Sequence, residues 1–172
     1  MIEQKDLGFE QAVLIGIINK NQTASRLDEY LNELAFLTHT AGGTVSKRFT
    51  QRMETPHPKT FIGSGKMEEV KAYVRTHDIG TVVFDDELTP AQQANIEQLL
   101  KRKIVDRTGL ILDIISQFVD LKQRGANYFG ICPFHDENTA SFSVAPSKQI
   151  YNCFGCNVGG NVFSFVMEYQ KI

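Results

Sequence analysis

Several features that would place this 172-residue chain in a familiar class are missing from its sequence. It has no run of about 18 consecutive apolar residues, so no transmembrane helix is predicted. Its first residues, MIEQKDLGFEQ, contain acids and no apolar core, so they do not have the pattern of a secretory signal peptide. We therefore expect a cytoplasmic protein that does not act at a membrane.

Cysteine is scarce, and its distribution is uneven. The chain has three cysteines, all of them between residues 132 and 156. An odd number fits a disulfide framework poorly, and a reducing cytosol would keep them as thiols. The cysteines are therefore candidates for metal binding rather than for cross-linking.

An excess of charge of one sign is lacking as well. The formal net charge is −2, and residues 118–172 contain four basic and four acidic groups. The chain as a whole thus has no electrostatic signature of nucleic-acid binding. Any contact with phosphates must depend on a local group of residues.

No catalytic motif is recognisable. The nearest approach to a phosphate-binding loop, residues 63–67 (GSGKM), lacks the earlier glycine and the Ser or Thr after the lysine, so we interpret it as a turn into a helix. A phosphate at that helix N-terminus stays an alternative. Asp85-Asp86-Glu87 is interpreted as a solvated loop, with a magnesium site as the less favoured alternative. His57 is expected to be exposed, and no catalytic residue is assigned.

The first hundred residues alternate between strand-like and helix-like patterns. The run AVLIGII (12–18) is typical of a strand buried on both faces. Thr89-Pro90-Ala91-Gln92 predicts a helix start, with Thr89 as N-cap and Gln92 closing a capping box. The other predicted strands are 44–53, 81–86 and 103–106, and the other predicted helices follow residues 27–35 and 65–76. This alternation predicts a mostly parallel sheet flanked by helices.

From about residue 118 the pattern changes to short strands, aromatics, glycines and cysteines. Strands are predicted at 128–131, 141–145 and 149–153, followed by a helix capped by Asn161. A helical stripe over 109–119 joins the two patterns. We therefore predict a small parallel α/β domain over residues 1–110 and a small antiparallel zinc ribbon with a C-terminal helix over 111–172.

The spacing of the cysteines predicts one zinc ion. Cys132 and His135 are separated by two residues, as are Cys153 and Cys156, and 17 residues lie between the pairs. Two such knuckles supply four tetrahedral donors, and because protein fills all four positions the zinc would be structural. Gly155 is expected to adopt a positive φ angle. The alternative is three buried thiols beside an incidental surface histidine.

Aromatic residues surround the predicted ligands. We expect them to shield a small core that the metal stabilises, because a segment of about 50 residues is too small to be stable on burial alone. The aromatic residues in question are Phe134, Phe142, Tyr151 and Phe154.

Residues 112–170 resemble the N-terminal zinc-binding domain of DnaG-type bacterial primases. The resemblance is carried by VDLKQRGANY, CPFH, SFSVAPSKQIY, CFGC and the GGN that opens the last helix. It implies a zinc ribbon that helps to recognise the single-stranded DNA template, acting with a separate catalytic domain. Where the family usually has Lys-Thr-Pro, this chain has Asn138-Thr139-Ala140, and Val158 stands where a small or basic residue is common.

The primase resemblance implies a set of residues for contact with single-stranded DNA. Basic side chains would follow the phosphates and aromatic rings would stack on bases. The candidates are Lys122, Arg124, Lys148, Tyr151 and Phe154. The alternative is that these residues form a solvated face and a packed core.

Residues 12–115 resemble the N-terminal domain of HflX-type GTPases. The resemblance is carried by AVLIGI, LDEYLNELAFLTHTAGGTV, TQRMETPHPKTFIGSGKMEEVKAYV, TVVFDDELTPAQQANIEQLL and VDRTGLILDI. It implies a parallel α/β domain that associates with the ribosome, while a later domain, not present here, hydrolyses GTP.

The two resemblances meet at residues 111–115 (ILDII), which fit both families. We expect a primase-type zinc module that binds single-stranded DNA, fused to a small α/β domain and without catalytic activity of its own. The alternative is a ribosome-associated protein in which the α/β domain binds and the zinc unit only adds stability. A third interpretation is a fusion without an integrated function.

Overall fold

The structure is a computed structural model that describes residues 11–171, and it separates into two compact units. The first unit ends at Leu110 and the second begins at Ile111. Within the described range, no helix is both long enough and apolar enough to cross a membrane. Each unit is described in turn below.

The first unit is built on a four-stranded parallel sheet, as the sequence predicts. Its strands lie in the order β2-β1-β3-β4. Their bounds are β1 (Ala12–Ile18), β2 (Val45–Arg52), β3 (Thr81–Phe84) and β4 (Lys103–Asp106). The central position of β1 explains its continuous apolar run, because helices cover both of its faces.

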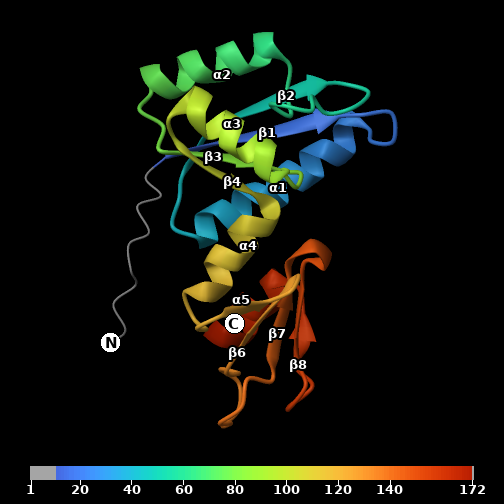
Figure 1. Cartoon of the computed structure of the whole chain (residues 1–172), viewed down its shortest axis with the longest axis vertical. Coiled ribbons are helices and arrows are strands. Elements are labelled where there is room, and N and C mark those ends of the chain that lie inside the picture. Colours follow the sequence, from blue (N-terminus) through green and yellow to red (C-terminus); the bar gives the residue numbers. More distant parts are fainter. Residues whose placement is uncertain (1–10, 172) are drawn as a thin grey trace. The chain divides into compact units, whose positions relative to one another are not determined.

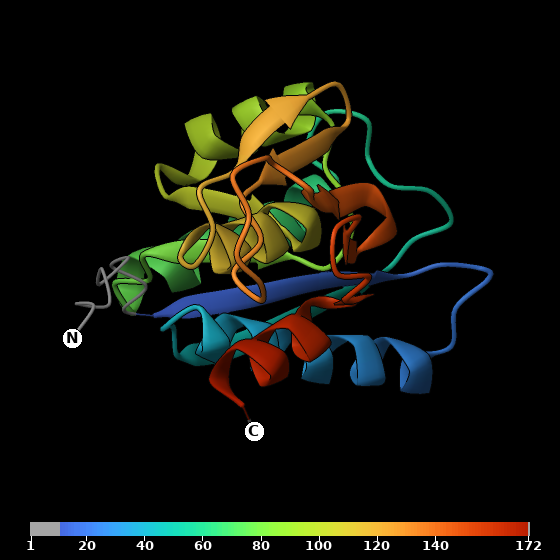
Figure 2. The same cartoon turned by 90° about the horizontal axis from the view of Figure 1, so that it is seen from below.

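Helices connect the strands of this sheet and cover its two faces (Figures 1 and 2). Their bounds are α1 (Ala24–Thr40), α2 (Ser64–Thr76) and α3 (Pro90–Leu100). A further helix, α4 (Arg107–Ser116), follows β4 and contains the boundary between the two units. α1 packs on one face, where Gly16 of β1 leaves room for Leu27 and Leu31. α2 and α3 lie on the other face, over Val13, Ile15 and the side chains beside them. The chain moves from β1 outward to β2 and then returns past β1 to β3, so the direction of the connections reverses. Because each connection is right-handed, the helices after this reversal lie on the other face of the sheet.

The start of α3 has the predicted hydrogen bonds, and one of the side chains that the helix buries is polar. The capping box is present, with Thr89 Oγ1 accepting from Gln92 N at 3.1 Å and Gln92 Oε1 accepting from Thr89 N at 2.9 Å. Along the helix, Ile96 and Leu100 are buried, whereas Ala94 is exposed and Leu99 is 38% exposed. Gln92 is buried as well, because its amide donates to the carbonyl of His57 at 2.9 Å.

The second unit is a five-stranded antiparallel sheet followed by α5 (Val162–Gln170). The strands are β5 (Lys122–Arg124), β6 (Asn127–Gly130), β7 (Phe142–Ala145), β8 (Ile150–Cys153) and β9 (Gly159–Gly160), and they pair in that order. Residues 146–148, between two of the predicted strands, form a short 3-10 helix, η1 (Pro146–Lys148). Asn161 caps α5 as predicted, its Oδ1 accepting from Ser164 N at 2.9 Å. The predicted fold class is confirmed.

The register of this sheet gives it two chemically different faces. Side chains alternate between the faces along each strand, and Phe142, Val144, Tyr151 and Cys153 occupy the buried face. The opposite face carries seven side chains, which lie in two rows across the paired strands. One row contains Lys122, Phe129, Ser143 and Asn152, and the next contains Arg124, Asn127 and Ile150. None of these seven is buried, so they form an open sheet face.

Candidate metal centre and nucleic-acid surface

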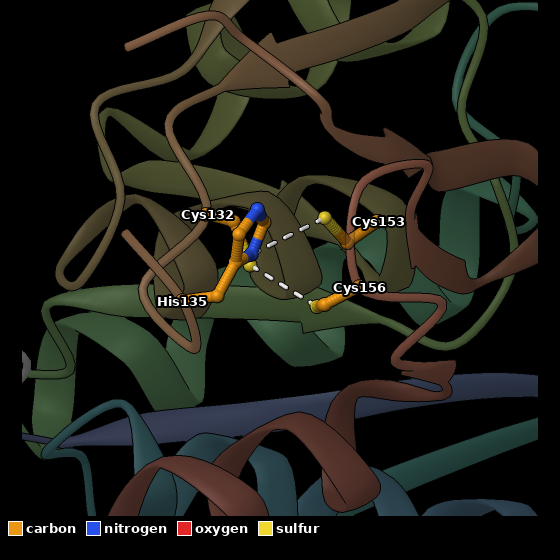
Figure 3. A group of neighbouring side chains, drawn as sticks. All are labelled: Cys132, His135, Cys153 and Cys156. Carbon is orange, nitrogen blue, oxygen red and sulfur yellow. Dashed lines mark hydrogen bonds between the residues drawn. The ribbon is translucent and has the colours of Figure 1, made fainter. Parts of the chain in front are cut away.

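Two loops of the second unit bring together the four residues predicted to bind metal. Cys132 and His135 lie in the loop after β6, Cys153 ends β8, and Cys156 follows it. Their ligand atoms lie within 4.8 Å of one another (Figure 3). In the range 11–171, this is the one group of three or more Cys, His, Asp or Glu side chains arranged to hold a metal ion.

The two ligand pairs, Cys132 with His135 and Cys153 with Cys156, have the same backbone hydrogen bond to their first cysteine. The N–H of Phe134 donates to Cys132 Sγ at 3.4 Å, and the N–H of Gly155 donates to Cys153 Sγ at 3.3 Å. In both pairs the amide two residues after the first cysteine points at its sulfur. Such donors stabilise a thiolate, which is the form of cysteine that binds metal.

The spacing of the ligand atoms fits a tetrahedral zinc ion. Cys132 Sγ lies 3.9 Å from Cys156 Sγ, and Cys153 Sγ lies 3.8 Å from His135 Nδ1. With Zn–S bonds of about 2.3 Å, two sulfurs of a tetrahedral site are about 3.8 Å apart. Three sulfurs and one imidazole nitrogen are also a donor set that zinc prefers.

The electrostatics of the three thiols favour a bound cation. Burial is the main reason why the pKa of the Cys132 thiol is raised to about 12; the N–H of Phe134 opposes it, and the nearby Cys153 and Cys156 act in the same direction as burial. Burial acts in the same direction on Cys153, but hydrogen bonds from the N–H groups of Cys156 and Gly155 outweigh it, so the pKa of that thiol is lowered. Three thiolates this close repel one another, and a divalent cation among them removes that repulsion.

Gly155 does not have the conformation that was expected of it. Its φ angle is not positive, and the left-handed residue of this loop is Asn157, with φ 62°. What the position requires is space, because a Cβ there would lie 2.7 Å from His135 Nε2. The expectation from turn geometry was therefore wrong.

Glu137 completes the surroundings of the histidine and was not identified as a site residue from the sequence. Its Oε2 lies 3.1 Å from His135 Nε2, and its Oε1 accepts from the N–H of Cys132 at 2.8 Å. That backbone hydrogen bond is the main reason why the pKa of Glu137 is lowered. An acidic residue two positions after a candidate histidine ligand is the signal that could have identified it.

The aromatic core beside the metal site differs from the prediction at one position. Phe134, Phe142 and Tyr151 pack together as expected, but Phe154 is 70% exposed and contributes no cover. Phe165 of α5 takes its place, with ring centroids 5.3–5.7 Å from those of the other three. Only the position of α5 on the sheet reveals this, because Phe165 is distant from the ligands in sequence.

The five residues expected to contact single-stranded DNA lie in different environments. Lys122 and Arg124 are exposed on the open sheet face, Lys148 is exposed in η1, and Phe154 is exposed in the second cysteine loop. Tyr151 is 3% exposed and points into the core. This burial does not fit stacking of Tyr151 on a base.

Phe129 adds an aromatic ring to the open sheet face that sequence reasoning did not single out. It pairs with Lys122 across β5 and β6, and the guanidinium of Arg124 lies 5.9 Å from its ring centroid. Tyr128 and Phe129 are adjacent in the sequence and both are half-buried, and only the register shows that Phe129 is the ring on the open sheet face.

The other positions considered from the sequence have structural explanations. Gly63 precedes α2 as its N-cap, so residues 63–67 are the predicted turn into a helix. Asp85 is buried against Arg107, with 2.6 Å between Oδ1 and Nη2, rather than lying in a solvated loop. His57 is half-buried instead of exposed, because its Nδ1 accepts from the N–H of Lys59 at 3.1 Å.

Comparison with known families matches both units. A family model described as "GTP-binding GTPase N-terminal" matches residues 28–116, more than half of the chain. A second model, described as "CHC2 zinc finger" and built for the DnaG zinc ribbon, matches residues 91–172. Both resemblances read from the sequence are confirmed. The two matches share residues 91–116, which include α4.

Individual relatives also fall into two groups, GTPases of the HflX type and DNA primases. The GTPase HflX of Flavobacterium psychrophilum is 56% identical over 117 residues, covering 68% of this chain and 28% of the relative. The DNA primase of Geobacillus stearothermophilus is 58% identical over 62 residues, covering 36% of this chain and 10% of the relative. The chain therefore spans less than one third of the length of either relative.

Among solved structures, the crystal structure of the SsGBP and GDP complex is 23% identical to this chain. The match covers 63% of this chain and 29% of that chain, with a TM-score of 0.50. At this identity the likeness concerns the fold alone.

Proposed function

The chain belongs to the GTP-binding GTPase N-terminal family, and we propose that the zinc finger joined to that domain binds single-stranded DNA in the manner of a primase zinc module. One zinc ion, held by Cys132, His135, Cys153 and Cys156, would stabilise this unit. All four donors come from protein, so the ion would organise the sheet and the two loops rather than activate a substrate.

The open sheet face is the observation that carries the proposal. It places two cations, Lys122 and Arg124, beside the partly exposed ring of Phe129. Single-stranded nucleic acid is bound by this combination, in which cations follow the phosphates and bases stack on an aromatic ring. Since the opposite face of the sheet is filled by the core, the open face is the side on which a strand can lie.

Binding of a fluorescent single-stranded oligonucleotide by the zinc-loaded chain, measured by anisotropy at several salt concentrations, tests the proposal. Removing one phosphate contact with Lys122→Ala should weaken binding and make the slope of log K against log salt shallower by about 0.7. Phe129→Ala should weaken binding by about 1–3 kcal/mol with no change in that slope.

A matched control is available in the same unit. Lys171 is exposed but follows the end of α5, outside the open sheet face. Lys171→Ala should therefore bind like the unchanged chain. Equal losses for Lys122→Ala and Lys171→Ala would mean that only total charge matters, and the open face would not be the binding surface.

A second candidate function, association with the ribosome, is favoured by the edge of the α/β sheet. β2 lies at the end of the strand order and exposes Lys47, Arg48 and Arg52. The ammonium of Lys47 is held over the rings of Phe49 and Tyr73, at 4.9 and 5.0 Å from their centroids. Cations along an edge strand suit the phosphates of structured RNA.

Sedimentation with ribosomes and the oligonucleotide titration distinguish the two functions. If the zinc unit binds, Lys122→Ala weakens the oligonucleotide complex and Arg52→Ala leaves it unchanged. If the α/β unit binds the ribosome, Arg52→Ala lowers the fraction of chain that sediments, and Lys122→Ala does not.

A further inference from the structure

The imidazole of His135 is held from the side opposite the sulfurs by a single carboxylate. Nδ1 faces Cys153 Sγ at 3.8 Å, whereas Nε2 lies 3.1 Å from Glu137 Oε2. The Glu137 side chain is 8% exposed and the His135 side chain is 28% exposed. The two ring nitrogens therefore face different chemical environments, one rich in sulfur and one anionic.

The carboxylate is itself fixed by the backbone of two segments. Glu137 Oε1 accepts from the N–H of Cys132 at 2.8 Å and from the N–H of Ser141 at 3.2 Å. Oε1 is thus occupied by two backbone donors, and Oε2 is left facing His135 Nε2 at 3.1 Å. A proton on Nε2 would face this carboxylate oxygen and leave the lone pair of Nδ1 for a metal.

The second cysteine loop leaves room for this arrangement at Gly155. A Cβ at that position would lie 2.7 Å from His135 Nε2 and 2.9 Å from its Cε1, closer than side chains approach one another. The ring lies between the metal ligands on one side and Glu137 on the other. Any side chain at position 155 would therefore push the imidazole away from the sulfurs.

We propose that Glu137 is a positioning residue that fixes His135 with Nε2 protonated and Nδ1 toward the metal, and that Gly155 provides the space in which this ring lies. The inference rests on the proposed zinc site and adds two residues outside the four ligands. Glu137 also ties the metal site to the start of β7 through Ser141, so the same carboxylate orders the loop between the strands.

Zinc affinity of the full chain, measured by competition with a chromophoric chelator, tests the role of Glu137. Glu137→Gln replaces one acceptor oxygen by an amide that cannot accept, and zinc affinity should fall roughly 10–100-fold. Asp136→Asn removes the same charge from an exposed neighbour and should leave the affinity unchanged. Wild-type affinity in Glu137→Gln, or equal losses in the two variants, would overturn the inference.

A double-mutant cycle tests the role of Gly155. Gly155→Ala should weaken zinc binding in the unchanged chain because of the clash with the imidazole. In a His135→Cys background the ring is absent while four ligands remain, so both Gly155→Ala and Glu137→Gln should have much smaller effects. Undiminished effects in that background would show that neither residue acts through the ring.

The tautomer can be observed without any substitution. In the zinc-loaded wild-type chain, long-range 1H–15N correlation spectra should show His135 bound through Nδ1 and protonated at Nε2. Binding through Nε2 would overturn this inference and leave the zinc site intact. A wild-type chain that bound no zinc would overturn the zinc site itself and this inference with it.

Discussion

At the scale of single residues, Arg107 shows how the α/β unit neutralises a buried charge. Its side chain is 8% exposed, and Nη2 lies 2.6 Å from Asp85 Oδ1 and 2.8 Å from the carbonyl of Tyr30. Glu33, which is half exposed, adds a contact at 3.3 Å to Nη1. A buried ion pair of this kind adds little net stability, but the loss of one partner leaves the other charge unpaired.

We predict that Asp85→Ala lowers the free energy of unfolding of the α/β unit by about 3–5 kcal/mol. The physical reason is that Arg107 would stay buried with only the half-exposed Glu33 as a counter-charge. Urea unfolding followed by circular dichroism measures the effect. Glu33→Gln is the matched control and should cost less than about 1 kcal/mol, because that pair is partly exposed to solvent. Equal costs for the two variants would contradict the argument.

Asp86 gives a prediction that depends on pH. Burial raises the pKa of Asp86 above its ordinary value of 3.8, and the charge of Asp85 adds to this while Arg107 opposes it. The folded state thus binds the proton more tightly than the unfolded state, so the contribution of Asp86 to stability is present below pH 3.8 and is lost as pH rises through the folded pKa.

The substitution Asp86→Asn should therefore make the α/β unit more stable at pH 7, because the neutral amide avoids burial of a charge. The difference from wild type should shrink as the pH falls toward 3.8. Urea titrations at a series of pH values measure it. A gain that does not change with pH would mean that the effect is not electrostatic.

At the scale of elements, the start of α3 is fixed by local hydrogen bonds. The Thr89 hydroxyl and the Gln92 amide each accept from the backbone of the other. We predict that Thr89→Ala lowers the free energy of unfolding by about 1 kcal/mol. Thr76→Ala, at the exposed end of α2, should stay within about 0.5 kcal/mol of wild type. A similar change in both variants would show that the cap does not matter.

Elements with a strong local signal were predictable from the sequence. The apolar run of β1, the capping box of α3 and the Asn161 cap of α5 depend on neighbours in the chain, and the structure contains all three. β5 and β9 were missed, because three polar residues and two glycines have no strand pattern of their own. Those strands exist through pairing with β6 and β8.

In the metal site, too, features with a local sequence signal could be predicted, and features that depend on the folded arrangement could not. The spacing of two cysteine pairs is visible in a linear sequence, so the four proposed ligands could be named from it. The contacts of Glu137 could not, because one of its carboxylate oxygens accepts from both Cys132 and Ser141, on either side of it in the chain. The exposure of Phe154 and the burial of Tyr151 also depend on where α5 packs.

At the scale of the whole molecule, the two units should respond differently to removal of metal. We predict that a chelator unfolds the second unit and leaves the α/β unit folded, because zinc binding contributes about 10–16 kcal/mol to small domains of this kind. Backbone amide exchange, read unit by unit, measures this. Protection should be lost beyond residue 127 and kept in β1 and β3.

A substitution reproduces that loss without a chelator. Cys153→Ser removes one proposed ligand and should lower both metal content and protection in the second unit. Ser143→Ala, on the open face of the same sheet, should retain both. Unfolding of the two units together, or an unchanged metal content in Cys153→Ser, would contradict the prediction.

The position of α4 decides how the chain can be divided for experiments. The helix is continuous from Arg107 to Ser116, and the junction at Leu110 and Ile111 falls inside it, at two buried side chains. A cloning boundary at that junction would cut a helical turn and leave each fragment with a frayed, apolar end. Fragments that both retain residues 107–116 are the natural choice for expressing either half separately.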